Sequence, residues 1–256
     1  MSTPKWVTPK GTQEKYQAAR TKFVAHALLA DFVLHKEQQE KRPLEVLSLP
    51  GTSFQWEHML HAASSCRIRL TGLESKPKVF QKGELMLEGL QMPMRYIRTT
   101  DLNFWKQEGA QKDVVWLDYC GPWSKLKAAS VEAMFANRRL RYGNTGPLLA
   151  LTLMDGMDFH TIGDLMMLAD TKTKRFKARV GGIPRWIDQI ARKHGGSAEL
   201  KFLLHYRDGL RNPSATPMLL FVLQLHARPL KFDVWNAATM DLLQDRLANV
   251  TSKIGR

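Results

Sequence analysis

Three apolar segments of this chain each end at a residue that can hold a ligand, and this pattern limits the folds open to it. The first, residues 44–53, ends in a glycine turn, and the second, residues 67–74, ends in the acid Glu74. The third, residues 113–123, carries Asp118 at the tip of its apolar run, with an aromatic residue directly after it. In open α/β sheets, ligands bind outside the carboxyl ends of the strands. The three segments therefore predict one ligand crevice with a reaction site beside it.

Helix-like and strand-like segments alternate along most of the chain. Helices separate most of the predicted strands, which lie at residues 44–49, 67–73, 94–99, 113–117, 147–154, 199–206 and 218–226. The link between the last two strands is only a loop and cannot hold a crossover helix, so these two strands should pair antiparallel. The predicted fold class is therefore α/β: a doubly wound, seven-stranded, mostly parallel sheet with an antiparallel last strand.

Two helical additions to this sheet are predicted. Residues 1–43 form an N-terminal helical extension, because Ala, Leu and Phe recur at helical spacing over residues 12–40 and Pro43 ends the helix. The second addition is a basic helical insertion at about residues 158–197, within a single domain of residues 44–256. The N-terminal helix has three possible positions: on the sheet, over the ligand crevice or against a second copy of the chain. The sequence predicts no oligomeric state.

The chain has 38 Lys and Arg residues against 24 Asp and Glu residues, a formal net charge of +14. Such an excess predicts a polyanionic partner, most simply DNA or RNA, although a generally basic protein is the plainer alternative. Residues 135–144 and 171–196 are densely basic and carry aromatics that can stack on a base, namely Tyr142, Phe176 and Trp186. An anionic membrane is a weaker alternative, because neither segment has a clean apolar face. The candidate nucleic-acid-binding residues are Arg138, Arg139, Arg141, Lys172, Lys174, Arg175, Lys177, Arg179 and Arg185.

Membrane and metal sites are not expected. No apolar run is long enough to span a bilayer, and the first residues lack the apolar core of a signal peptide, so we expect a cytoplasmic protein. The two cysteines, Cys66 and Cys120, lack the spacing of a zinc site, and His58 and His61 lack the H-E-x-x-H pattern. We therefore predict no structural metal.

The order of these elements resembles the class I (Rossmann-like) S-adenosylmethionine-dependent methyltransferases. The resemblance covers roughly residues 44–229 and implies a Rossmann-like methyltransferase domain with S-adenosyl-L-methionine as its cofactor. In that family a glycine-rich turn after the first strand approaches the cofactor; here the turn reads LPGTS, a degenerate version that keeps only Gly51. The family's second strand ends in an acid that binds the ribose hydroxyls. The implied cofactor contacts are Leu49, Pro50, Gly51, Thr52, Glu74, Asp101 (near the adenine amino group) and Asp118.

The third ligand-holding segment resembles the catalytic motif of methyltransferases that modify amino groups in nucleic acids. In those enzymes the strand ends in Asp or Asn, two prolines and an aromatic; here it reads DYCGPW. The resemblance implies that Asp118 orients a base exocyclic amine, similar to adenine N6, toward the methyl group. It also implies that Tyr119 or Trp123 stacks on the extruded base.

Two other methyltransferase chemistries are less favoured by the sequence. Cytosine-C5 enzymes attack the ring with a cysteine thiolate, but their Pro-Cys pair is absent, and a lone cysteine such as Cys120 is more often a small core residue. Viral-type ribose 2′-O-methyltransferases use a Lys-Asp-Lys-Glu set with a lysine near the end of a middle strand. The fifth predicted strand here ends MDGMD, without a lysine, which argues against this subclass.

A non-enzymatic alternative also stands. The degenerate glycine turn is typical of a decayed enzyme, so the chain could be a catalytically inactive methyltransferase-fold protein that binds nucleic acid or a protein partner. The two hypotheses differ in the crevice: Gly51, Glu74 and Asp118 should converge if a cofactor binds, whereas Phe54 or Trp56 should fill the space if none does. Methyl transfer to a protein or small molecule is a third possibility, which the strong positive charge disfavours.

Overall fold

The computed structural model describes residues 20–64, 67–107, 110–119, 121, 123–154, 172–207 and 217–230. Its helices are α2 Arg20–Glu40, α3 Gln55–Ala63, α4 Pro77–Leu90, α5 Asp101–Gln107, α6 Lys125–Ala136 and α8 Lys172–Lys193. Its strands are β1 Leu44–Ser48, β2 Ile68–Leu73, β3 Met94–Ile97, β4 Val114–Asp118, β5 Leu148–Met154, β6 Ser197–Arg207 and β7 Pro217–His226. Both cysteines and residues 155–171 lie outside the described residues.

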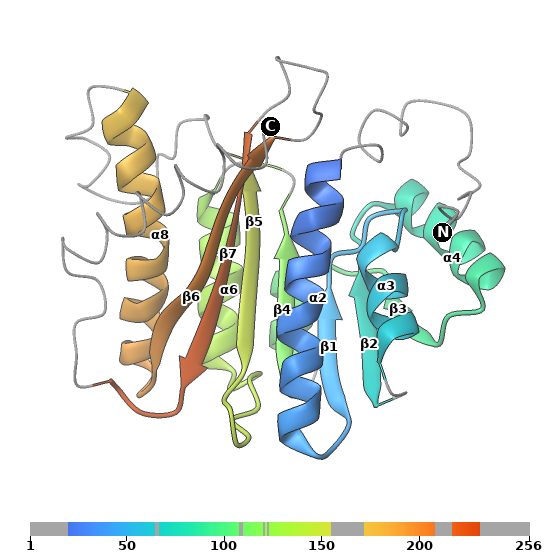
Figure 1. Ribbon diagram of the computed structural model, residues 1–256, viewed down its shortest axis with the longest axis horizontal. Coiled ribbons are helices and arrows are strands. Elements are labelled where there is room, and N and C mark those ends of the chain that lie inside the picture. The colour runs from blue at the N-terminus through green and yellow to red at the C-terminus, as the bar shows by residue number, and fades with distance from the viewer. Residues whose placement is uncertain are drawn as a thin grey trace.

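The seven strands form one sheet in the order β3-β2-β1-β4-β5-β7-β6 (Figure 1). The first five strands run parallel, and β7 pairs antiparallel with both β5 and β6. The predicted fold class, including the antiparallel last strand, is confirmed. The direction in which the chain adds strands reverses between β1 and β4, and such a switch point is where open α/β sheets bind ligands.

Helices cover both faces of the sheet. One hydrophobic cluster joins α2 and α3 to the sheet, and a second joins α5, α6 and α8 to the opposite face. Along β4, Val114 and Trp116 belong to the first cluster while Val115 and Leu117 belong to the second, as the two-residue period of a strand requires. Helix α2 crosses the front of the sheet in Figure 1 and buries Leu29 and Val33. The N-terminal helix therefore packs on the sheet, the first of the three positions open to it.

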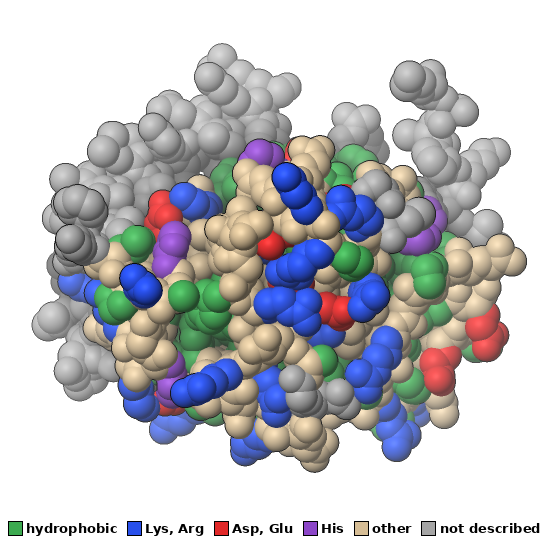
Figure 2. Space-filling view, turned by 90° about the horizontal axis from the view of Figure 1, so that it is seen from below, with side chains coloured by type: hydrophobic (Ala, Val, Ile, Leu, Met, Phe, Trp, Pro, Cys, Tyr) green, Lys and Arg blue, Asp and Glu red, His purple; other side chains and the backbone are tan. Residues whose placement is uncertain are grey.

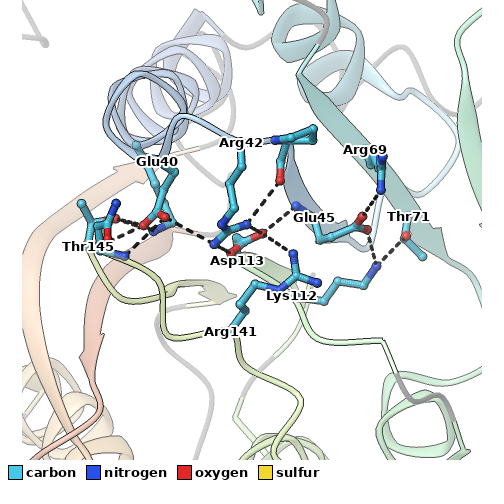
Figure 3. Close-up of polar contacts among 12 residues, drawn as sticks. Glu40, Arg42, Glu45, Arg69, Thr71, Lys112, Asp113, Arg141 and Thr145 are labelled. Atoms are coloured by element: carbon cyan, nitrogen blue, oxygen red, sulfur yellow. Dashed lines mark hydrogen bonds and ion pairs between the residues drawn. The ribbon is translucent and has the colours of Figure 1, made fainter.

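Polar contacts fix the lower end of α2 to the sheet (Figure 3). The buried Lys36 ammonium donates to Glu40 at 3.2 Å and to the Thr145 hydroxyl at 2.6 Å. The Glu40 carboxylate accepts from the Thr145 backbone N–H at 3.0 Å. Burial alone would raise the pKa of Glu40, but the hydrogen bonds from Thr145 and Lys36 lower it to about 2. These contacts join the end of α2 to the loop that leads into β5.

A fully buried carboxylate, Asp113, joins the starts of two strands at the same edge (Figure 3). It accepts two hydrogen bonds from the Arg42 guanidinium, at 2.6 and 3.0 Å, and one from the Glu45 backbone N–H at 2.8 Å. The neighbouring Lys112 ammonium, also buried, donates to the Thr71 hydroxyl at 2.9 Å. The network thus connects the end of α2 and the starts of β1 and β4 to Thr71 in the middle of β2.

No helix among the described residues has both the length and the apolar character needed to cross a membrane.

Replacing Asp113 with Ala should lower the free energy of unfolding by about 3 to 5 kcal/mol, because Arg42 and the Glu45 amide lose their shared buried acceptor. Urea unfolding measures the change. Arg69→Ala is the control, since the Arg69 ion pair with Glu45 is largely exposed and should contribute less than about 1 kcal/mol. Equal losses in the two variants would contradict the proposed role of Asp113.

Candidate active site

The turn after β1 lies at the switch point and is open on one side. Gly51 has a left-handed backbone with φ of 62°, a conformation that glycine adopts without strain. A Cβ atom placed on Gly51 would meet no atom of the described residues within 4 Å, so among these residues one side of the turn is open. The Tyr96 hydroxyl donates to the Gly51 carbonyl at 3.3 Å and ties the turn to β3. Its neighbours Leu49, Pro50 and Thr52 are partly exposed.

Two carboxylates follow the strands on either side of β1. Glu74, partly exposed, comes directly after β2, and one of its oxygens accepts the Lys76 backbone N–H at 2.7 Å. Asp118 is the last residue of β4. Because β2, β1 and β4 are adjacent and parallel, Glu74, Gly51 and Asp118 lie at one edge of the sheet, with β2 and β4 roughly 10 Å apart. The structure thus brings these three predicted residues to the same edge.

A lysine that the sequence did not single out lies beside Asp118. The Lys22 ammonium, near the start of α2, is 3.9 Å from the Asp118 carboxylate. The Asp118 side chain is only 11% exposed, so this ion pair is largely shielded from water. Helix α2 therefore completes the polar edge that β1, β2 and β4 begin.

Buried polar groups lie behind this edge. Glu57, in the first turn of α3, is 1% exposed, and its Oε1 has no hydrogen-bond partner among the described residues. The Ser48 hydroxyl at the end of β1 faces the Glu57 carboxyl group, and within the described set both ring nitrogens of His26 lack partners. The His26 ring meets the edge of Trp116 with 5.1 Å between centroids. Unpaired buried polar groups are costly, so each of them calls for a physical explanation.

The pKa values of the buried acid Glu57 and the buried base His26 shift in opposite directions. Burial raises the pKa of Glu57 to about 7, and the nearby Asp118 carboxylate acts in the same direction. Burial lowers the pKa of His26 to about 3, helped by the positive charge of Lys22. His26 is therefore neutral at pH 7, and Glu57 is poised between its neutral and charged forms.

The sequence interpretation of Tyr119 and Trp123 as stacking platforms conflicts with where their rings lie. Tyr119 is buried, and its hydroxyl donates to the Asp101 carboxylate. Burial, reinforced by that carboxylate, raises the pKa of Tyr119 well above its ordinary value. Trp123 is also buried and meets the Trp186 ring at 5.3 Å. Neither ring is open to a base. Tyr119 follows Asp118 directly, so its side chain points to the opposite face of the sheet, under α6.

Asp101, the first residue of α5, is drawn into this packing. The Asp101 oxygen that accepts from Tyr119 also accepts from the Ser130 hydroxyl at 2.7 Å. That oxygen is committed to holding α5 against α6, whereas the sequence assigned Asp101 to the cofactor's adenine.

The two basic segments lie apart in the fold. Arg138, Arg139 and Arg141 follow α6 and lie at the amino edge of the parallel strands, opposite the candidate active site. Arg139 donates to the Trp105 carbonyl at 2.8 Å, and Arg141 lies 3.7 Å from Asp113. The other candidates occupy α8, which runs down from the carboxyl edge in Figure 1: the exposed Arg185, and Lys172, Lys174, Arg175, Lys177 and Arg179, whose side chains lie outside the described set.

The described residues contain no group of three or more His, Cys, Asp or Glu side chains that could hold a metal ion.

Replacing Glu57 with Gln should flatten the dependence of stability on pH. A carboxyl group with a pKa of 4.5 when unfolded and about 7 when folded holds its proton more tightly in the native state. Its contribution to stability is therefore fully present below pH 4.5 and is lost as the pH rises through 7, by roughly 3 kcal/mol.

Urea unfolding between pH 4.5 and 8 tests this prediction, with the exposed Glu84→Gln as control. The wild type and the control should both lose this stability, and Glu57→Gln should lose much less. Parallel curves for all three proteins would show that Glu57 is not buried as described.

No protein-family model matches the sequence, and no curated protein matches it. Solved structures are similar at low sequence identity. A SAM-dependent methyltransferase from Agrobacterium tumefaciens is 15% identical, with a TM-score of 0.50 over 78% of this chain and 61% of that one. This chain therefore spans about three fifths of the length of the Agrobacterium protein.

Two further structures extend the similarity. A putative class I S-adenosylmethionine-dependent methyltransferase from Listeria monocytogenes is 14% identical, with a TM-score of 0.52 over 94% of this chain and 73% of that one. A plantazolicin methyltransferase, in complex with a desmethyl analogue and SAH, is 13% identical, with a TM-score of 0.51 over 83% of this chain and 89% of that one. Together with the strand order, these similarities show that the chain has the class I S-adenosylmethionine-dependent methyltransferase fold.

Proposed function

We propose that this protein is an S-adenosylmethionine-dependent methyltransferase that acts on nucleic acid. The observation that carries the proposal is the carboxyl edge of β2, β1 and β4, where an open glycine turn lies between two carboxylates at the switch point of the sheet. Gly51 permits close approach of a ligand to the backbone, Glu74 offers a carboxylate for vicinal ribose hydroxyls, and Asp118 lies beside the expected acceptor.

The polar groups at this edge fit the cofactor chemically. The amino-acid part of S-adenosylmethionine carries an ammonium group, and the buried Glu57 carboxyl group, whose Oε1 has no partner among the described residues, is an acceptor suited to it. The Ser48 hydroxyl supplies a second hydrogen-bonding group at the end of β1. When bound, the cofactor supplies a methyl group already activated by its sulfonium, so the protein has only to align donor and acceptor and to manage one proton.

The two aromatic residues that could fill the crevice are buried in the core, which supports the enzyme over the inactive alternative. The buried Phe54 ring meets Tyr96 with 5.2 Å between centroids. The buried Trp56 ring meets Trp116 at 4.7 Å, against the middle of β4. Both belong to the hydrophobic cluster beneath α2 and α3.

Nucleic acid is the proposed substrate class because of charge and position. The chain has a formal net charge of +14, and the first half of α8, nearest the carboxyl edge, holds Lys172, Lys174, Arg175, Lys177 and Arg179 (Figure 1). A cationic helix that begins at the carboxyl edge of the sheet would hold the phosphates while the target group is presented. The acceptor expected from the sequence is a base exocyclic amine, oriented by Asp118.

The ion pair between Lys22 and Asp118 favours a second acceptor, a ribose hydroxyl. A ribose hydroxyl is a weak nucleophile until it loses its proton, so negative charge develops on its oxygen as it attacks. A lysine ammonium 3.9 Å from the Asp118 carboxylate is placed to stabilise that charge, and the carboxylate to hold the lysine in position. The sequence had disfavoured this chemistry for want of a lysine after the fifth strand, but α2 provides one from a different direction.

Calorimetric titration with S-adenosylmethionine and S-adenosylhomocysteine tests the cofactor assignment. We expect micromolar binding, and we expect Glu74→Ala to weaken it about tenfold to a hundredfold through the loss of charged hydrogen bonds to the ribose. The exposed Glu84→Ala is the control and should bind as the wild type does. Absence of binding in the wild type, with and without nucleic acid, would favour the inactive alternative.

Transfer of a labelled methyl group to RNA and DNA of the same sequence tests the substrate and the acceptor. Asp118→Ala should reduce turnover by at least about a hundredfold, with little change in cofactor affinity. Lys22→Met should reduce turnover comparably only if the acceptor is a hydroxyl. Digestion of the product to nucleosides then separates the candidates: label on the ribose of RNA supports the hydroxyl, and label on a base of either polymer supports the amine. Unchanged turnover in Asp118→Ala would contradict the assigned role of Asp118.

A further inference from the structure

A basic surface covers the edge of the sheet opposite the candidate active site. Figure 2 views the molecule from below, toward the starts of the parallel strands, and shows Lys and Arg side chains gathered across the centre of this face. The turn from α2 into β1, the starts of β2 and β4, and the loop from α6 to β5 meet here. We name it the amino-edge surface and define it by Lys41, Arg42, Arg69, Arg138, Arg141 and Tyr142.

At this edge the acidic groups are more deeply buried than the arginine side chains. The network of Figure 3 contains five cations and three acids: Lys36, Arg42, Arg69, Lys112 and Arg141 against Glu40, Glu45 and Asp113. Glu40 and Asp113 are buried, whereas the side chains of Arg42, Arg141 and Arg69 are 30%, 38% and 71% exposed. The acids therefore bind the cationic groups from the buried side, and the surface that remains accessible to a partner is positively charged.

Two more cations stand at positions where a glycine would fit more easily. Lys41, directly after α2, and Arg138, after α6, are exposed and have left-handed backbones with φ of 51° and 53°. A residue with a Cβ pays roughly 1 kcal/mol or more for this conformation, and glycine is the usual residue at such helix ends. Both positions instead add positive charge to the surface.

The arginines form a row across adjacent strands. Arg69 belongs to β2, Arg42 precedes β1, and the Arg141 backbone N–H donates to the Lys112 carbonyl at 2.9 Å, next to β4. Because β2, β1 and β4 are neighbours, the row advances by roughly 5 Å per strand. Arg42 and Arg141 are paired with Asp113 on their inner side, and their exposed sides, together with the largely exposed Arg69, present a row of positive charge that suits the phosphates of a nucleic-acid backbone.

An exposed aromatic residue makes the partner more specific. Tyr142 follows Arg141 directly and is 41% exposed. The other large hydrophobic side chains exposed in the described part of the chain, Phe23, Leu85 and Leu126, belong to α2, α4 and α6. A single aromatic among cations suits a base stacked beside held phosphates, whereas a membrane would need an apolar face.

We infer that the amino-edge surface binds single-stranded nucleic acid, with its arginine row on the phosphates and Tyr142 stacked on a base. The surface lies one strand length from the candidate active site, roughly 15 to 20 Å for five residues, so the two sites are distinct. The inference goes beyond methyl transfer and does not require a bound cofactor.

The experiment measures binding of a fluorescent single-stranded RNA of about 15 nucleotides by anisotropy, over a range of salt concentrations and without S-adenosylmethionine. The combined variant Lys41→Gln, Arg69→Gln, Arg138→Gln leaves the buried network intact. It should weaken binding at low salt at least about tenfold and reduce the slope of log affinity against log salt by about 2. The control, Lys78→Gln, Lys82→Gln, Lys106→Gln, removes three exposed positive charges from α4 and α5 and should leave the slope nearly unchanged.

Tyr142→Ala separates stacking from charge. It should weaken binding by about fivefold or more while leaving the salt slope as in the wild type, because stacking involves no counterion release. Equal slopes in the two combined variants would mean that only net charge matters, and unchanged binding in all the variants would place the nucleic acid elsewhere; either result overturns the inference. Failure of the cofactor titration leaves this experiment unaffected, so the two proposals fail independently.

Discussion

The buried carboxylate of Asp113 holds together the parts of the chain on which the sheet depends. It accepts hydrogen bonds from Arg42, at the end of α2, and from the backbone of Glu45 in β1, while it stands itself at the start of β4. A buried charge is tolerated only when it is paired and fully hydrogen-bonded, and this one is. The register of β1 against β4, and hence the position of their carboxyl ends, is set by a contact at the opposite edge of the sheet.

The buried polar groups at the two edges of the sheet differ in whether they are hydrogen-bonded. At the amino edge, Asp113, Glu40 and Lys36 are buried and hydrogen-bonded within the described part of the chain. At the carboxyl edge, Glu57 and His26 are buried with atoms that have no partner there. Satisfied groups stabilise a fold, whereas unsatisfied ones are kept where a ligand completes them. The contrast separates an edge whose buried polar groups are hydrogen-bonded from one where some of them are not.

Helix α2 connects these two edges. Its last turn is bound to the amino edge through Lys36 and Glu40. Its first turn places Lys22 beside Asp118 at the carboxyl edge. Between these ends its apolar side packs on the sheet. A helix that the sequence sets apart as an extension thus contributes both to the core and to the chemistry of the candidate site.

The sequence by itself determined the order of strands and helices, the antiparallel pair at the end, and the placing of Gly51, Glu74 and Asp118 at strand ends. These depend on local periodicity and on a glycine turn, which neighbouring residues specify. Only the tertiary structure decided that Lys22 meets Asp118, that Glu57 is buried, and that Tyr119 and Trp123 face the core. Such contacts join residues far apart in the sequence. Whether a side chain of a strand is buried depends on which helices cover the face of the sheet to which it points. The basic residues were visible from composition, but their division between α8 and the amino edge followed from the path of the chain through the sheet.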